Sequence, residues 1–208
     1  MNNYNYTDSQ NLTPDEALAL LKEGNKHFRS GNPARPHLTD HERRAALTAQ
    51  QRPFCVLVGC SDSRVSPELL FGRGLGDLFI VRNAGNVVDI AAMGSIEYGV
   101  AVLGAPLIVV LGHERCGAVQ AAINVVENDA TYPGSIGQMI EPIIPAVIRA
   151  RRDGLVDLLD RSVRANVQRI VERLRTTEQM LIEPQRLGNL KIIGARYDLD
   201  DSVVDFFE

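Results

Sequence analysis

Continuous apolar runs constrain this chain more than any other feature. Residues 54–58, 77–81 and 106–111 are short, mainly apolar, rich in β-branched side chains, and lack the polar alternation of a half-exposed strand. Such runs are typical of strands buried on both faces, which occur in parallel sheets covered by helices. Helical patterns separate the runs, so right-handed crossovers are expected. The sequence therefore predicts an α/β fold.

The predicted architecture is a central, mostly parallel β-sheet flanked by helices, with about four parallel strands and one antiparallel edge strand. Residues 190–195 supply the fourth parallel strand, and residues 202–207 form the edge strand after a turn at 198–201. Helical periodicity or capping predicts the helices around the sheet. They cover residues 89–104, 118–126, 133–153, 155–177 and 178–187, the last interrupted by Pro184.

The first 50 residues are predicted to be a tail and a helical arm, and residues 51–208 the α/β domain that carries the candidate site described below. Residues 1–11 are polar and lack periodicity, so disorder is expected there. The stretch Thr13-Pro14-Asp15-Glu16 is typical of a capping box, and the helix that it opens is expected to end near Ser30. A second helix is expected at 39–48. The arm has two options, packing on its own domain or on a neighbouring subunit.

Charge and composition argue against several classes of partner. The formal net charge is -4, with 26 acidic and 22 basic residues, so nothing draws the chain to nucleic acid or an anionic membrane. No apolar stretch reaches the roughly 18–20 residues needed to span a bilayer. An odd number of cysteines, three, argues against a disulfide scaffold and for a reducing compartment. Since the N-terminus has no apolar signal segment, we expect a cytoplasmic protein.

Metal-ligating side chains stand where two of the apolar runs end. Cys60 follows the first run, and His113 and Cys116 follow the third as a His-x-x-Cys pair. Ligands bind at the carboxyl ends of the strands in open parallel sheets, so these side chains are expected to converge. Thiolates with imidazole favour zinc over magnesium or calcium. Three protein ligands leave one tetrahedral position open, which is typical of a catalytic zinc site.

Neighbouring side chains refine this interpretation. Cys55 lies an odd number of residues before Cys60, which points the two side chains to opposite faces of the strand. Cys55 is therefore interpreted as an ordinary buried thiol. Asp62 can reach the metal as a fourth ligand, and Arg64 is placed to pair with it by a bidentate hydrogen bond. Asp62 thus has two options, ligating zinc or turning to the arginine.

At these positions the sequence resembles the β-class carbonic anhydrases. The matching motifs are Cys60-Ser61-Asp62-Ser63-Arg64, Arg82-Asn83-Ala84-Gly85-Asn86 and Gly112-His113-Glu114-Arg115-Cys116-Gly117-Ala118, within a likeness that runs from about residue 51 to 126. The resemblance implies one Zn²⁺ per chain held by Cys60, His113 and Cys116. It also implies reversible hydration of carbon dioxide to bicarbonate and a proton by zinc-bound hydroxide, which the Asp62–Arg64 dyad orients. In some members of the family the aspartate becomes the fourth zinc ligand.

The resemblance further implies that Gln51, Phe79 and Tyr98 bind the substrate. It implies a homodimer or a dimer of dimers, with the N-terminal arm on the partner and the pocket at the interface. The chain departs from the family pattern at two places. Leu57 stands where members regulated by bicarbonate carry tryptophan, and Ser202 stands where a glycine is usual. The departures put bicarbonate regulation and the shape of the last turn in question, and no residue is assigned as proton shuttle.

Three other functions would fit parts of the sequence. A hydrolase of carbonyl sulfide or carbon disulfide on the same fold would use the same attack geometry. A non-catalytic zinc-binding module would need a fourth ligand from the protein. A dinucleotide-binding domain is suggested by residues 72–76, Gly-Arg-Gly-Leu-Gly, but these precede a strand instead of joining a strand to a helix. That last interpretation is rejected.

Overall fold

The computed structural model describes residues 12–31, 38–152, 154 and 156–208. Residues 1–11, for which the sequence predicts disorder, lie outside these ranges. So does residue 155, the predicted start of a helix. Everything below concerns the described residues.

Five strands form one sheet in the order β2-β1-β3-β4-β5. Their bounds are β1 (Cys55–Cys60), β2 (Leu78–Asn83), β3 (Leu107–His113), β4 (Lys191–Tyr197) and β5 (Val204–Phe207). The first four strands are parallel, and β5 runs antiparallel to β4 at one edge. This confirms the predicted sheet. The strands β1 and β3 run past their predicted ends, so Cys60 and His113 are themselves the last strand residues.

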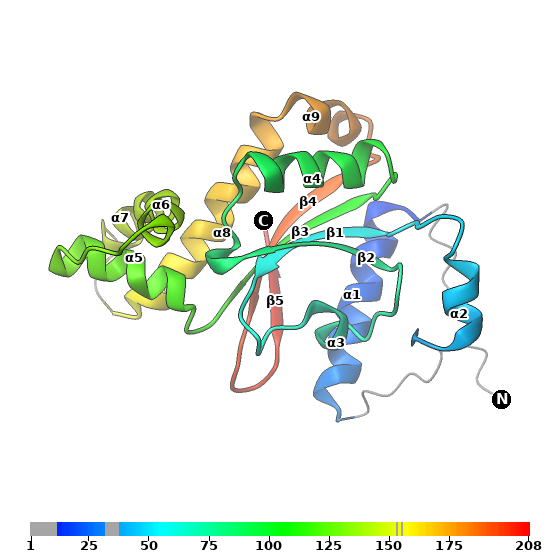
Figure 1. Cartoon of the computed structure of the whole chain (residues 1–208), viewed down its shortest axis with the longest axis horizontal. Helices are drawn as coiled ribbons and strands as arrows, with labels where there is room; N and C mark the ends of the chain where they lie inside the picture. The colour runs from blue at the N-terminus through cyan, green and yellow to red at the C-terminus, as the bar shows by residue number, and fades with distance from the viewer. Residues whose placement is uncertain (1–11, 32–37, 153, 155) are drawn as a thin grey trace.

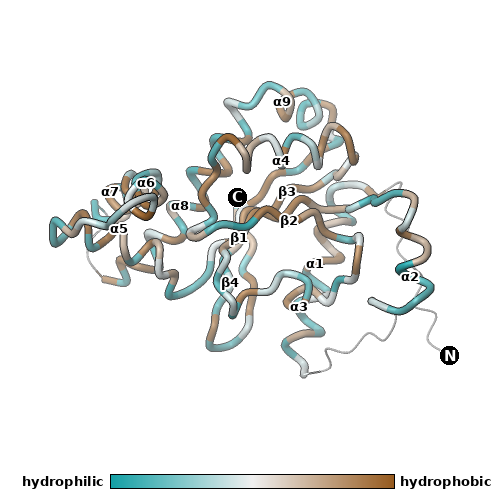
Figure 2. The backbone as a smooth tube through the Cα atoms, in the orientation of Figure 1, coloured by the Kyte–Doolittle hydropathy of each residue, from teal (hydrophilic) through white to brown (hydrophobic). Residues whose placement is uncertain are grey.

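Helices cover both faces of the sheet (Figure 1). On one face lie α4 (Ile90–Ala101), α8 (Leu158–Thr176) and α9 (Gln179–Arg186). Val56 and Val58 of β1 pack there against Ile96. On the other face lie α1 (Pro14–Arg29) and α3 (Pro67–Leu70), where Leu57 packs against Leu21. Burying each such side chain contributes about 1.5–3 kcal/mol, which is why β1 and β3, whose residues are all buried, are mainly apolar (Figure 2).

The first helix begins as predicted. Thr13 Oγ1 accepts a hydrogen bond from the Glu16 N–H at 3.3 Å, and Glu16 Oε2 accepts one from the Thr13 N–H at 2.8 Å. Asn25, which is 5% exposed, ties α1 to the start of β5 of the same chain. A shorter second helix, α2 (His41–Ala46), is capped by Asp40. The domain boundary at residue 50 and the contact of the arm with a partner stay predictions.

The helices α5 (Gly117–Asn128), α6 (Ser135–Ile140) and α7 (Ile144–Arg152) stand together beyond the carboxyl ends of the strands (Figure 1). The prediction of one helix over 133–153 is wrong. A 3₁₀ turn, Glu141–Ile143, separates α6 from α7. Pro142 lies in this turn, and a proline has no N–H with which to continue an α-helix. The break lets Ile143 and Val147 pack against Cys60 and Cys116 in one apolar cluster.

The last helix corrects a second expectation. The chain stays α-helical through Pro184, although the sequence predicts an interruption there. Proline removes only one N–H from the helix, and the carbonyl left without it belongs to Met180, which is 52% exposed and open to water. Leu181 is fully buried and holds the helix on the core. Among the described residues, no helix is long and apolar enough to cross a bilayer.

Candidate metal centre

Two side chains from adjacent strands and one from the start of a helix meet at one end of the sheet. Cys60 ends β1, His113 ends β3, and Cys116 lies three residues later, at the start of α5. Their sulfur and ring-nitrogen atoms all lie within 4.8 Å of one another. Among the described residues, no fourth His, Cys, Asp or Glu side chain joins this group. The structure thus brings together the three ligands that the sequence suggested.

Local backbone features bring Cys116 back beside His113. Gly112 lies where α8 passes under β3, and a Cβ atom there would come within 2.8 Å of the side chains of Val163 and Val167. Arg115 then adopts a left-handed conformation, with φ of 52°. This conformation reverses the chain over one residue, at a cost that non-glycine residues rarely accept. The loop is therefore shaped to put a thiol next to the imidazole.

His113 presents a free lone pair to the two sulfurs. The ring is fully buried, and its Nδ1 lies 2.9 Å from the Glu114 carbonyl oxygen. Since a carbonyl only accepts, Nδ1 donates in this contact, which in a neutral ring leaves the lone pair on Nε2. Nε2 is buried without a hydrogen-bond partner, and the nearest carboxylate oxygen, Oδ2 of Asp62, is 3.9 Å away. Such a nitrogen is costly unless it binds a cation.

The two sulfur atoms also favour binding of a cation. The Cys116 side chain, and then His113 and the backbone N–H of Gly85, lower the pKa of Cys60 against the effect of burial. The Cys60 thiolate and burial raise the pKa of Cys116 in turn. Two sulfurs this close cannot both be anionic unless a positive charge lies between them. Thiolate and imidazole ligands fit zinc, so the residues present suit the metal that the sequence suggested.

Asp62 and Arg64 form a tight pair beside the metal group. Asp62 Oδ1 accepts from the Arg64 N–H at 2.9 Å and from its Nε at 3.0 Å, while Oδ2 accepts from Nη2 at 2.8 Å. The Arg64 guanidinium holds the pKa of the Asp62 carboxyl far below its usual range. The carboxylate is therefore ionised at neutral pH and, of its two options, faces the arginine.

Comparison with known proteins now places the chain. The carbonic anhydrase family model matches residues 55–204. Carbonic anhydrase 2 of Mycobacterium tuberculosis is 46% identical over 193 residues, which cover 92% of this chain and 91% of that protein. The β-carbonic anhydrase CcaA is 25% identical and superposes with a TM-score of 0.72, covering 92% of this chain and 95% of that one. This chain belongs to the β-class carbonic anhydrases.

A further solved structure is similar in fold. A tetrameric β-carbonic anhydrase of Sordaria macrospora has a TM-score of 0.70 at 24% identity, and the match covers 93% of this chain and 95% of that one. At this identity the likeness concerns the fold alone. The five-stranded sheet with its antiparallel edge strand is therefore the carbonic anhydrase fold.

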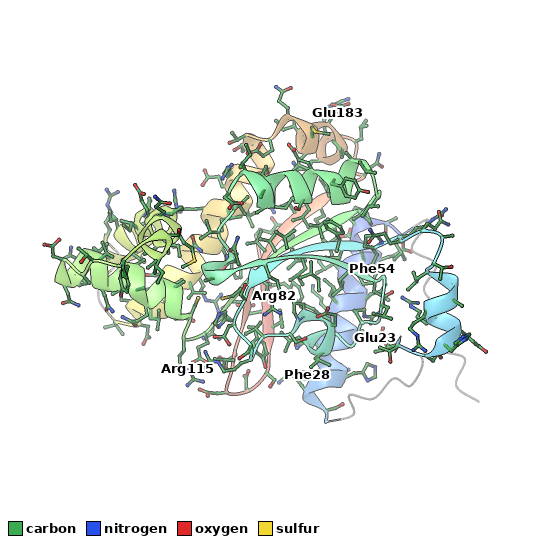
Figure 3. All side chains as sticks on the ribbon, viewed as in Figure 1. Glu23, Phe28, Phe54, Arg82, Arg115 and Glu183 are labelled. Atoms are coloured by element: carbon green, nitrogen blue, oxygen red, sulfur yellow. The ribbon has the colours of Figure 1, made fainter. Side chains whose placement is uncertain are left out.

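Arg82 is a residue of the site that sequence reasoning missed. Its Nε donates to the Cys60 carbonyl at 2.8 Å, and its Nη2 donates to the carbonyls of Asp62 at 2.8 Å and Val65 at 2.9 Å. These hydrogen bonds fix the backbone that carries Asp62 and Arg64. Arg82 itself lies near the middle of the molecule (Figure 3). The one available signal was its place at the head of the motif Arg82–Asn86, to which the sequence assigned no role.

The predicted substrate residues of this carbonic anhydrase gather at the opposite end of the sheet. Gln51 and Tyr98 line a cavity of about 610 Å³, and the rings of Phe79 and Tyr98 are 6.1 Å apart. Phe79 pairs with Val56, which lies four residues before Cys60. Four residues of strand place Phe79 about 13 Å from the level of Cys60. Gln51 precedes the strand altogether. Within one chain these three residues do not reach the metal group.

Proposed function

We propose that this carbonic anhydrase hydrates carbon dioxide reversibly at one zinc ion per chain, held by Cys60, His113 and Cys116. One observation carries the proposal. Three donor atoms lie within 4.8 Å of one another, and one of them is a buried nitrogen that has no other partner. No other His, Cys, Asp or Glu among the described residues completes the group, so one tetrahedral position is left for solvent.

The Asp62–Arg64 dyad would orient the attack. The chemistry that zinc supplies in such a site is Lewis acidity, which lets water act as a nucleophile near neutral pH. The Asp62 carboxylate only accepts hydrogen bonds, so a water beside it points an O–H toward Asp62 and a lone pair toward the substrate. Arg64 holds both carboxylate oxygens, and Arg82 holds the backbone beneath them. Asp62 is thereby kept in one orientation during turnover.

A second copy of the chain would complete the pocket. Gln51, Phe79 and Tyr98 lie together but far from the metal group of their own chain. We therefore propose a homodimer, or a dimer of dimers, in which these residues of one copy face the metal group of the other. Gln51 would donate a hydrogen bond to the developing bicarbonate, and the two rings would form an apolar wall. The tetrameric Sordaria macrospora relative supports such an assembly.

The test combines zinc content with activity on the same samples. Cys60→Ser is expected to lose the metal and carbon dioxide hydration, because serine is a poor zinc ligand. Cys55→Ser is the matched control, since Cys55 is also a fully buried thiol but packs on the other face of the sheet. It should keep one zinc per chain. Elemental analysis and stopped-flow hydration assays give both readouts.

Two outcomes would contradict the proposal. Full zinc content in purified Cys60→Ser would remove the assigned ligand set. Wild-type protein with full zinc and no hydration activity, but with hydrolysis of carbonyl sulfide in a parallel assay, would keep the metal centre and change the substrate. The two assays therefore separate the site from its reaction.

A further inference from the structure

The loop that carries two metal ligands begins against the turn between β4 and β5. His113 and Tyr197 are the last residues of β3 and β4, and they pair in register. The Glu114 N–H donates to the Tyr197 carbonyl at 2.9 Å, which extends the ladder by one residue. The start of the ligand loop is thus attached to a second segment, distant in sequence.

That second segment is itself firmly held. Asp198 Oδ1 accepts from the N–H groups of Asp200 at 2.8 Å and Asp201 at 3.2 Å, which closes the turn. Asp198 also pairs with Arg196 at 2.5 Å, and Arg196 pairs with Asp160 of α8 at 2.7 Å. The turn is therefore a rigid support rather than a free loop.

The side chain of Glu114 binds the turn between β4 and β5. Its Oε2 accepts a hydrogen bond from the Leu199 N–H at 3.0 Å, and the side chain is only 20% exposed. Arg115 makes a second link, donating to Asp200 at 2.6 Å, beside the turn (Figure 3). That ion pair is 51% and 71% exposed, so it contributes little. The carboxylate of Glu114 is the stronger of the two attachments.

The same residue fixes the imidazole. The Glu114 carbonyl oxygen lies 2.9 Å from Nδ1 of His113, and this contact leaves Nε2 free to face the sulfurs. The partner of the second ring nitrogen sets the tautomer and the direction of a ligating histidine. Glu114 is thus held at its N–H and at its carboxylate, while its carbonyl holds the ring.

We propose that Glu114 is a positioning residue of the metal centre, acting through the Leu199 hydrogen bond to hold the peptide that orients His113. The inference rests on the zinc site proposed above. It assigns a task to a side chain that touches neither the metal group nor the substrate. Oε2 of Glu114 also lies 3.4 Å from Nη2 of Arg115, but that guanidinium is 51% exposed, so solvent screens the ion pair and the task is assigned to the hydrogen bond with the Leu199 N–H.

Three variants test this assignment in the zinc-loaded enzyme. Glu114→Ala removes the acceptor, whereas Glu114→Gln keeps an amide oxygen that can accept from Leu199. Asp200→Asn weakens only the exposed ion pair. Zinc release to a chromophoric chelator is expected to be about tenfold faster or more in Glu114→Ala, and close to wild type in the other two. The visible absorption of the cobalt-substituted proteins should change in Glu114→Ala alone, which a general loss of stability would not produce.

The result that overturns the inference is wild-type zinc release and an unchanged cobalt spectrum in a folded Glu114→Ala. Equal impairment in Glu114→Gln would also overturn it, because the charge would then matter and not the hydrogen bond. Failure of the proposed zinc site looks different, since wild-type protein would then take up no zinc. In that event ¹⁵N NMR of the His113 ring tests the inference on the same protein. Glu114→Ala should change the tautomer and Glu114→Gln should not.

Discussion

At the scale of single residues, Asp62 is the most constrained side chain of the site. Both of its oxygens accept from Arg64, and Arg82 binds its carbonyl. In the proposed mechanism, a carboxylate held in this way accepts a hydrogen bond from a group beside the metal. Because the Arg64 guanidinium is half exposed, the pair is also accessible to solvent and to a competing cation.

Asp62→Asn is expected to keep zinc and to lose hydration activity by about a hundredfold or more, because a misdirected nucleophile loses most of the benefit of positioning. Asparagine keeps the size of the side chain but presents an N–H₂ group on one side. Zinc content and stopped-flow rates on one sample check this. Asp205→Asn, which removes an ion pair distant from the dyad, is the control. Near wild-type turnover in Asp62→Asn would contradict the orienting role.

At the scale of elements, one buried asparagine connects α1 to the edge of the sheet. Asn25 Nδ2 donates to the Ser202 carbonyl at 3.0 Å, and its Oδ1 accepts from the Val204 N–H at 3.0 Å. Ser202 has a φ of 63°, the left-handed region that the usual glycine would adopt without strain. Although serine replaces the usual glycine, residue 202 keeps the left-handed conformation. The hydrogen bond from Asn25 of α1 helps to hold the turn in this conformation.

Asn25→Leu is expected to lower the free energy of unfolding by about 2–4 kcal/mol, because it leaves a buried N–H and a carbonyl without partners. Leucine branches at the same carbon and is larger, so the loss would not come from a cavity. Urea denaturation measures the change. Lys26→Ala, on the exposed side of the same helix, should shift stability by less than about 0.5 kcal/mol. Equal stability of Asn25→Leu and wild type would show that the tie contributes nothing.

The sequence located elements better than it located their ends. Apolar runs identified the buried strands because a strand covered on both faces has no polar positions. The sequence could not show that Asn83, His113 and Tyr197 also belong to strands. The hydrogen bonds to the neighbouring strand decide where each strand ends. Helical periodicity likewise continued through Pro142, where the backbone could not follow it.

The candidate site was predictable to different depths. Cys60, His113 and Cys116 could be grouped because parallel strands end at the same edge of a sheet. The role of Glu114 could not be foreseen, because it depends on the turn after β4, which is remote in sequence. The position of Gln51 relative to the metal group needed the register of β1, although nine residues along an extended chain already indicated a long separation.

At the scale of the whole molecule, the two halves of the proposed active site lie at opposite ends of one sheet. The metal group is at the carboxyl ends of β1 and β3, and the cavity at Gln51 and Tyr98 lies near the other end of β1. An isolated chain would therefore hold a metal centre without a substrate wall. Activity is expected to depend on association.

Mixing two inactive variants tests this arrangement. Cys116→Ser removes the metal group of one copy, and Gln51→Ala impairs the wall of the other. When they are unfolded and refolded together, the mixture should regain about a quarter of the wild-type activity per chain, because random pairing gives one intact site in about half of the dimers.

The control combines the two folded variants briefly, so that subunits do not exchange. The activity of this mixture should stay near the sum of the activities of the two separate variants. Recovery absent from the refolded mixture, with mixed dimers present by mass spectrometry, would show that each chain supplies its whole pocket.

Cys60 and His113 end two strands in the centre of the sheet, and the two large apolar clusters on the faces of that sheet include none of the three metal donors. Small zinc domains depend on their ion to fold. Folding of this chain is therefore not expected to need the proposed zinc, and the ion would be able to leave and return while the sheet stays folded. When zinc is scarce, such an enzyme is expected to persist as a folded apoprotein. It would regain activity by binding zinc again, without new protein synthesis.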